Sequence, residues 1–148
     1  MIAIAAESPS VSLKLFRVPP ESIKSETRVP TAPEGTPILE VVIVSATRTP
    51  IGTYKGSLKK LRCHELGSIV IKDVLKKSKY TADEIDEVIM GQVLTAGAGQ
   101  NPARQAAMNA GIPISKPAYT INQVCGSGLR AVITGYQSIK LGEFKNVI

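Results

Sequence analysis

An α/β fold, with helices on both faces of a mostly parallel sheet, is predicted by three features of this sequence. Short β-branched apolar runs alternate with amphipathic stretches of helical length between residues 39 and 148. Glycines and prolines mark the boundaries between these segments. Strands that alternate with helices favour parallel pairing, because a right-handed crossover through each helix brings the next strand alongside the last one.

The first 38 residues differ from the rest of the chain in composition. Six of the ten prolines fall within the first 37 residues, where they interrupt any helix or strand periodicity. We therefore expect residues 1–38 to be a disordered, proline-rich extension and residues 39–148 to form one domain. Four glutamates balance four basic side chains in the extension, unlike the acid-poor composition of a mitochondrial transit peptide. A cytoplasmic location is therefore expected, with mitochondria as the alternative.

The first strand is expected at Val41–Val44, because a continuous β-branched run is typical of a strand buried on both faces of a parallel sheet. A glycine-containing loop follows, and then a helix whose apolar residues recur at helical spacing. These apolar residues are Leu66, Ile69, Val70, Val74 and Leu75. A second strand is expected over residues 87–94.

The second helix is bounded by residues with clear capping preferences. Asn101 can cap its start, and Pro102 suits the first helical position because its missing N–H would have no partner there. Gly111 and Pro113 end the helix. Its body is rich in alanine, which allows close packing against a neighbour. The alanines are Ala103, Ala106, Ala107 and Ala110.

The last predicted elements are a third strand over residues 118–124, a glycine turn at residues 125–128 and a third helix. The apolar residues that define one face of this helix are Leu129, Val132, Ile133, Tyr136 and Ile139. A fourth strand begins at residue 146. A buried strand cut after three residues would leave its backbone groups unpaired, so we expect the sequence to be a fragment of a longer protein.

Charge and composition exclude several classes of partner. The formal net charge is +6, but basic and acidic residues interleave, and the chain has no tryptophan and two phenylalanines. No aromatic platform for nucleic acid binding is therefore expected. No segment approaches the roughly 20 apolar residues that span a bilayer, so no membrane partner is expected. The two cysteines lack the spacing of a zinc site, so no metal is expected.

Cys125 lies where the third predicted strand passes into the third helix. The first N–H groups of that helix and its positive dipole end lie beside the sulfur, which favours the thiolate. Gly126, Ser127 and Gly128 have small side chains, which lets a substrate approach the backbone. Their N–H groups can also support a thioester oxyanion. The alternative is that Cys125 is a small buried apolar residue.

Cys63 and His64 raise the possibility of a second reactive site. His64 is the only histidine in the chain, so a Cys63–His64 pair has to be considered. Adjacent side chains point to opposite faces of a strand and diverge by about 100° at a helix start, so a hydrogen bond between them is awkward. We expect a surface histidine and a partly buried cysteine here, and hence no evident general base for Cys125.

Three separate stretches resemble the thiolase family. The first is TINQVCGSGLRAV at Thr120–Val132, and the second is VSATRTPIG at Val44–Gly52, followed by Lys55 and Gly56. The third is GQVLTAGAGQNPARQA at Gly91–Ala106, continuing to AGIP at residues 110–113. The resemblance covers about residues 39–148 and is greatest to the acetyl-CoA acetyltransferases of the cytosolic type. It implies a layered thiolase-like fold, of which the N-terminal half alone is present.

The resemblance also implies a mechanism. Cys125 matches the nucleophile that takes an acetyl group from acetyl-CoA; a second acetyl-CoA then condenses with it to acetoacetyl-CoA, and thiolysis reverses these steps. The family needs no cofactor beyond its CoA substrates. Its activating histidine and second cysteine belong to C-terminal motifs that this sequence does not contain, so the isolated chain is expected to be inactive. A homodimer or homotetramer is implied for a full-length protein.

Two alternatives stay open at this point. One is a 3-ketoacyl-CoA thiolase of fatty-acid degradation, which shares the nucleophile segment and differs in the acyl-chain length. The other is a non-catalytic thiolase-like protein, which the missing histidine and second cysteine favour and the retained Cys125 segment opposes. The sequence carries little of the pocket that would decide between them.

Overall fold

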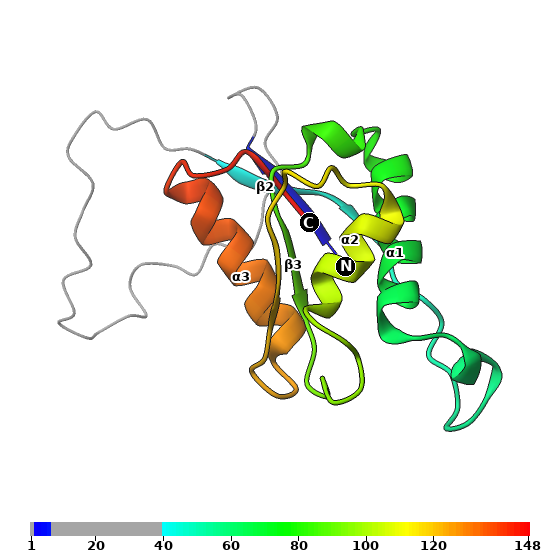
Figure 1. Cartoon of the computed structure of the whole chain (residues 1–148). Coiled ribbons are helices and arrows are strands. Elements are labelled where there is room, and N and C mark those ends of the chain that lie inside the picture. The colour runs from blue at the N-terminus through cyan, green and yellow to red at the C-terminus, as the bar shows by residue number, and fades with distance from the viewer. Residues whose placement is uncertain (1, 7–39) are drawn as a thin grey trace, which may run out of the picture.

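The computed structural model describes residues 2–6 and 40–148 of the chain (Figure 1). Its elements are β1 (Ile2–Ala6), β2 (Val41–Ala46), η2 (Ser57–Lys60), α1 (Cys63–Ser78), η3 (Ala82–Glu84), β3 (Val88–Gly91), α2 (Pro102–Ala110), β4 (Ala118–Ile121), α3 (Ser127–Lys140) and β5 (Asn146–Val147). The predicted alternation of strands and helices after residue 39 is confirmed. The second and third predicted strands are shorter than expected, since β3 ends at Gly91 and β4 at Ile121.

The described strands form two sheets, one with the order β2-β1-β5 and one made of β3 and β4, and the predicted parallel pairing is found in the second. β3 and β4 pair in parallel, and a parallel bridge joins Glu87 to Val147 at the start of β3. β1 pairs antiparallel with β2 on one side and with β5 on the other, so β2 and β5 run in the same direction. Of the described strands, β1 is thus the one that runs against the others.

Two predictions about the start of the chain are wrong. Residues 1–38 were expected to lack regular structure, yet Ile2–Ala6 form β1, and these residues precede the first proline, Pro9. Residues 7–38 of the expected extension lie outside the described residues. Val41–Val44 were expected to be buried on both faces, but Ile43 is 37% exposed; of the strands that the structure describes, only β1 pairs with β2.

Helices cover both faces of the sheet, as predicted (Figure 1). Val88 packs in a core with side chains of α1 and α2, while the next residue, Ile89, packs in a core with side chains of α3. Neighbouring residues of a strand point to opposite faces, so β3 separates the two cores. Among residues 2–6 and 40–148, no helix combines the length and the apolar character that crossing a bilayer requires.

Small residues bring α1 and α2 close together. A Cβ added at Gly67 of α1 would lie 2.8 Å from the Cβ of Ala106 in α2, which confirms the close packing expected of the alanine-rich helix. In α1, Ile71 is fully buried, although the predicted apolar face did not include it. Ile69 is 49% exposed, although the predicted apolar face did include it.

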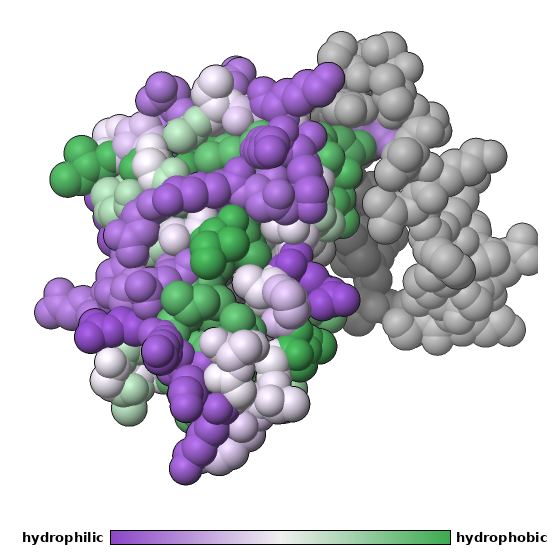
Figure 2. Space-filling model, turned by 90° about the vertical axis from the view of Figure 1, so that its right-hand side faces the viewer, coloured by the Kyte–Doolittle hydropathy of each residue, from purple (hydrophilic) through white to green (hydrophobic). Residues whose placement is uncertain are grey.

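Figure 2 views the molecule from the right-hand side of Figure 1, where hydrophilic surface surrounds smaller apolar patches.

The buried face of α3 differs from the predicted one. Its large apolar side chains were expected to face the core, yet Leu129 is 68% and Tyr136 45% exposed. The side that packs on the sheet carries mostly small residues. The buried residues of α3 are Ser127, Ala131, Gly135, Ser138 and Ile139. Ile139 is the member of the predicted apolar face that is fully buried.

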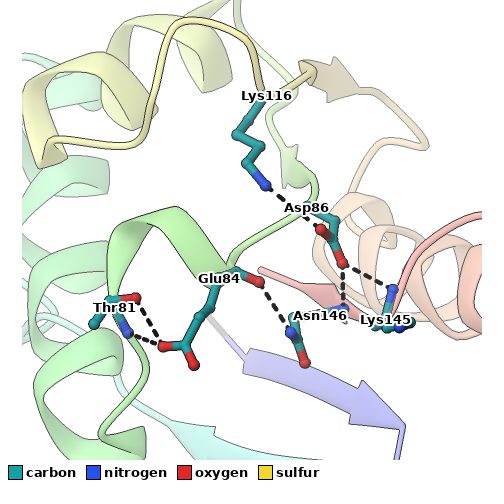
Figure 3. A network of polar contacts seen from close by, with 6 residues as sticks. All are labelled: Thr81, Glu84, Asp86, Lys116, Lys145 and Asn146. Carbon is teal, nitrogen blue, oxygen red and sulfur yellow. Dashed lines mark hydrogen bonds and ion pairs between the residues drawn. The ribbon is translucent and has the colours of Figure 1, made fainter.

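Asp86 links β5 to the segment that precedes β3 through hydrogen bonds (Figure 3). Its carboxylate accepts hydrogen bonds from the backbone N–H groups of Lys145 and Asn146, at 2.9 and 3.0 Å, and lies 3.5 Å from the ammonium group of Lys116. Burial acts to raise the pKa of Asp86, but these three donors outweigh it and hold the pKa below its ordinary value. The Asn146 side chain also donates to the Glu84 carbonyl at 2.9 Å.

Glu87 is a buried carboxyl without a cation partner among the described residues, and it yields a prediction about pH. Its side chain is 6% exposed, and Ser138 Oγ lies 3.5 Å from it. Burial, followed by the nearby charge of Glu143, raises its pKa. Because the pKa of Glu87 is raised in the folded state, the folded chain keeps its full stability below the unfolded pKa, about 4.5. It loses stability as the pH rises through the folded pKa of Glu87.

Glu87→Gln is therefore expected to raise the free energy of unfolding at about pH 7 and to have little effect at about pH 4, where Glu87 is protonated in both states. Denaturant unfolding at several pH values measures this difference. Glu143→Gln serves as the control and should act in the same direction, but less strongly. A variant that is less stable than the wild type at neutral pH would contradict the prediction.

Candidate functional site

Cys125 lies in the short connection between β4 and α3, one residue before the N-cap of the helix, Gly126. Its side chain is exposed, so the alternative of a buried apolar cysteine does not hold. The connection begins at the carboxyl end of β4, and β3 ends beside it, because the N–H of Gln92 donates to the carbonyl of Ile121 at 3.0 Å. The sulfur thus lies at the edge of the sheet where two parallel strands end and a helix begins.

Ser127 closes the turn that carries Cys125. Its hydroxyl donates to the Val124 carbonyl at 2.6 Å and accepts the N–H of Gln123 at 2.9 Å. The backbone N–H of Gly126 donates to the Gln123 carbonyl at 3.0 Å, and that of Ser127 to the Val124 carbonyl at 3.1 Å. Ser127 itself is 4% exposed. Gly126 and Ser127 therefore support the turn, and their N–H groups are occupied.

The next two N–H groups of α3, those of Gly128 and Leu129, are not occupied by hydrogen bonds within the described residues. A Cβ added at Gly128 would meet no atom within 4 Å, so the side-chain side of this residue is open. The positive end of a helix dipole adds to the attraction for negative charge. Gly128 thus has the free donor that the sequence led us to expect of all three residues.

Gly91, at the end of β3, allows the site to form although the sequence reasoning assigned it no role there. A Cβ at this position would lie 2.3 Å from the carbonyl carbon of Ser127 and 2.5 Å from the nitrogen of Gly128. The strand therefore passes directly against the first turn of α3. The sequence could have indicated this close contact, because a glycine at the end of an apolar strand run often marks close backbone approach.

Asn122 is a second residue that sequence reasoning missed. Its side-chain nitrogen donates to the Val93 carbonyl at 3.2 Å, and its side-chain oxygen accepts the N–H of Val124 at 2.9 Å. The amide thus joins the loop after β3 to the turn that holds Cys125. Asparagine two residues before a turn residue is a known local signal for this kind of bond.

Cys63 and His64 form no pair in the structure. The sulfur of Cys63 accepts a hydrogen bond from the side chain of Gln92 at 3.4 Å, and Nδ1 of His64 is buried without a hydrogen-bond partner among the described residues. No hydrogen bond within residues 40–148 joins either side chain to Cys125. In the same part of the chain, no three histidine, cysteine or acidic side chains gather as metal ligands would.

Comparison with known proteins gives one consistent result. The family model described as the thiolase N-terminal domain matches residues 41–148. An acetyl-CoA acetyltransferase of Pseudomonas aeruginosa is 52% identical over 109 residues, which are 74% of this chain and 28% of that protein. The cytosolic acetyl-CoA acetyltransferase of Mus musculus is 53% identical over 108 residues, covering 73% of this chain and 27% of its own length.

A solved structure agrees with these sequence matches. The crystal structure of a thiolase from Ascaris suum in complex with coenzyme A is similar with a TM-score of 0.66 and 43% identity. The similarity covers 67% of this chain and 26% of the solved chain. The present chain thus spans little more than a quarter of the length of the relatives that it matches.

Proposed function

This chain belongs to the thiolase family, and from that premise we propose that Cys125 is the nucleophile of an acyltransferase that carries an acetyl group as a thioester. The thiolate attacks the carbonyl carbon of acetyl-CoA, the tetrahedral intermediate expels the CoA thiolate, and the acetyl group stays on the sulfur. A second acetyl-CoA, deprotonated at its α-carbon, then displaces the sulfur and forms acetoacetyl-CoA. The reverse sequence is thiolysis.

The observation that carries this proposal is that Cys125 is exposed and that two N–H groups of α3 three and four residues later, those of Gly128 and Leu129, donate no hydrogen bond among the described residues. Such donors stabilise the oxyanion that forms when a thiolate adds to a thioester carbonyl. The open side-chain side of Gly128 leaves room for the reacting group. The names of the bacterial and mouse relatives support acetyl-CoA over longer 3-ketoacyl-CoA substrates, and the coenzyme A complex of the Ascaris thiolase supports a CoA ester.

The proposal assigns the remaining chemistry to groups outside these 148 residues. A general base has to take the proton of the thiol, and another group has to move the α-proton of the second substrate. His64, the one histidine of the chain, has its Nδ1 buried. We therefore expect the 148-residue chain to show no turnover by itself. A cytoplasmic location, supported by the name of the mouse relative, and a homo-oligomer of the full-length protein belong to the same proposal.

A chimaeric enzyme tests the proposal directly. Residues 41–148 replace the matched segment of the Pseudomonas acetyl-CoA acetyltransferase, which restores a chain of the relatives' length. After incubation with acetyl-CoA, peptide mapping by mass spectrometry should find one acetyl group, on the peptide that contains Cys125. An acetyl group on the Cys63 peptide, or on neither peptide, would refute the assignment. Faster acylation by long-chain 3-ketoacyl-CoA than by acetoacetyl-CoA would favour the degradative alternative.

A further inference from the structure

The residue before Cys125 has an unfavourable backbone conformation. Val124 has φ of 50°, in the left-handed region that β-branched residues avoid because their Cβ crowds the backbone. Its side chain is 64% exposed, so no burial of the valine offsets this strain. Strained, well-ordered residues of this kind concentrate at functional sites, where the surrounding structure holds them in place.

Hydrogen bonds fix the backbone of Val124 at both of its polar groups. Its N–H donates to Oδ1 of Asn122 at 2.9 Å, and its carbonyl accepts from the N–H of Ser127 at 3.1 Å and from the hydroxyl of Ser127 at 2.6 Å. Asn122 is itself held, since its amide nitrogen donates to the Val93 carbonyl at 3.2 Å. Val124 is therefore linked by hydrogen bonds to the loop after β3, through Asn122, and directly to Ser127, the first residue of α3.

This arrangement determines where the sulfur lies. A residue with positive φ changes the chain direction within a single step, so that β4 is followed almost at once by the N-cap of α3 at Gly126. Cys125, between Val124 and the N-cap, is exposed, and the free N–H groups of Gly128 and Leu129 follow it by three and four residues. An extended Val124 would lengthen the connection and take the sulfur away from the start of the helix.

We propose that Asn122 and Val124 are positioning residues, which hold the thiol of Cys125 in front of the N-terminus of α3. The proposal rests on the proposed role of Cys125 as a nucleophile, and it adds two residues that act on the reaction through their effect on the sulfur. Val124 acts through its conformation, and Asn122 acts through the bond that maintains this conformation.

The substitutions Val124→Gly and Asn122→Ala test the proposal in the 148-residue chain, with Asn122→Asp as the conservative variant. Glycine adopts positive φ freely and keeps the backbone N–H and carbonyl, so Val124→Gly should melt no lower than the wild type and keep the turn. Each variant is treated with iodoacetamide over a range of pH. The rates at Cys125 and Cys63 are followed in the same sample by peptide mapping, so that Cys63 is the internal control.

Asn122→Ala should slow alkylation of Cys125 about fivefold, the factor that corresponds to one lost hydrogen bond, and leave Cys63 unchanged. Val124→Gly keeps the backbone N–H and carbonyl and favours the same positive φ, so it should not slow alkylation. Asn122→Asp keeps an acceptor for the Val124 N–H and should recover part of the rate.

An unchanged rate at Cys125 in a folded Asn122→Ala variant, or a slower rate in a folded Val124→Gly variant, would overturn the positioning roles and leave the nucleophile in place. A wild-type Cys125 that reacts no faster than Cys63 at any pH would overturn the proposed nucleophile and the positioning roles together. The two failures are thus distinguishable, because the first appears in the variants and the second already in the wild type.

Discussion

Replacing Cys125 by alanine is expected to abolish acyl transfer in the chimaeric enzyme, with a loss of kcat on the order of 10⁴- to 10⁶-fold, as for other covalent nucleophiles. No other group in the turn can form the acyl intermediate, because Ser127 is buried and both its donor and acceptor roles are taken. The assay follows acetoacetyl-CoA thiolysis and the appearance of the acetylated peptide.

The free energy of unfolding of Cys125→Ala should stay within about 0.5 kcal/mol of the parent, because the exposed sulfur makes no hydrogen bond within the described residues. Cys63→Ala is the matched control, and it should retain activity because that thiol contacts Gln92 and not the turn. If Cys125→Ala kept more than a small residual rate, or if Cys63→Ala lost activity to the same extent, the nucleophile would be misassigned.

Gly91→Ala is expected to destabilise the chain by about 3 kcal/mol or more, near the upper end of the range for overpacked sites. The added methyl would lie 2.3 Å from the carbonyl carbon of Ser127 and 2.5 Å from the nitrogen of Gly128. Both are backbone atoms, so no side-chain rotation can relieve the contact, and either β3 or the start of α3 has to move. Thermal or urea unfolding of the 148-residue chain measures the loss.

Gly128→Ala is the control for this prediction, and the expected effect has the opposite sign. Its Cβ would meet no atom within 4 Å, and alanine in a helix is more favourable than glycine by roughly 0.5–1 kcal/mol. A modest gain in stability is therefore expected at position 128. Equal stabilities of the two variants would show that β3 and α3 do not approach each other as closely as the structure has them.

Predictions that depended on neighbouring residues agree best with the structure. The second helix begins after Asn101, whose side chain accepts the N–H of Arg104 at 3.2 Å, and it ends at Gly111 with φ of 91°. These boundaries depend on capping geometry within a few residues, and the sequence contains all of it. The location of Cys125 between a strand and a helix could be predicted for the same reason.

Features that depend on distant residues could not be predicted. Whether Ile43 is buried depends on which strand β2 pairs with, and the partner is β1, from a segment that no periodicity identified. The apolar face of α3 satisfies helical spacing, but the sheet packs against its small residues, Ala131 and Gly135. Periodicity shows that a helix has an apolar face, and it does not show which face another element will cover.

The same distinction applies to the candidate site. Cys125 and its glycines could be identified from the strand, turn and helix that surround them in the sequence. Gly91 and Asn122 contribute through contacts that cross from one strand end to another, at Ser127 and at Val93. These two residues gain a role only when the parallel pairing of β3 and β4 brings these loops together.

The pairing of β1 with β5 has a consequence for the order of folding. Ile4 lies opposite Val147, so this contact joins the two ends of the chain that the structure describes. Closing so long a loop costs more entropy than closing the local contacts between α1 and α2, and contacts of high sequence separation form slowly. During synthesis on the ribosome, β1 can pair with β5 only after nearly all of the described residues have emerged.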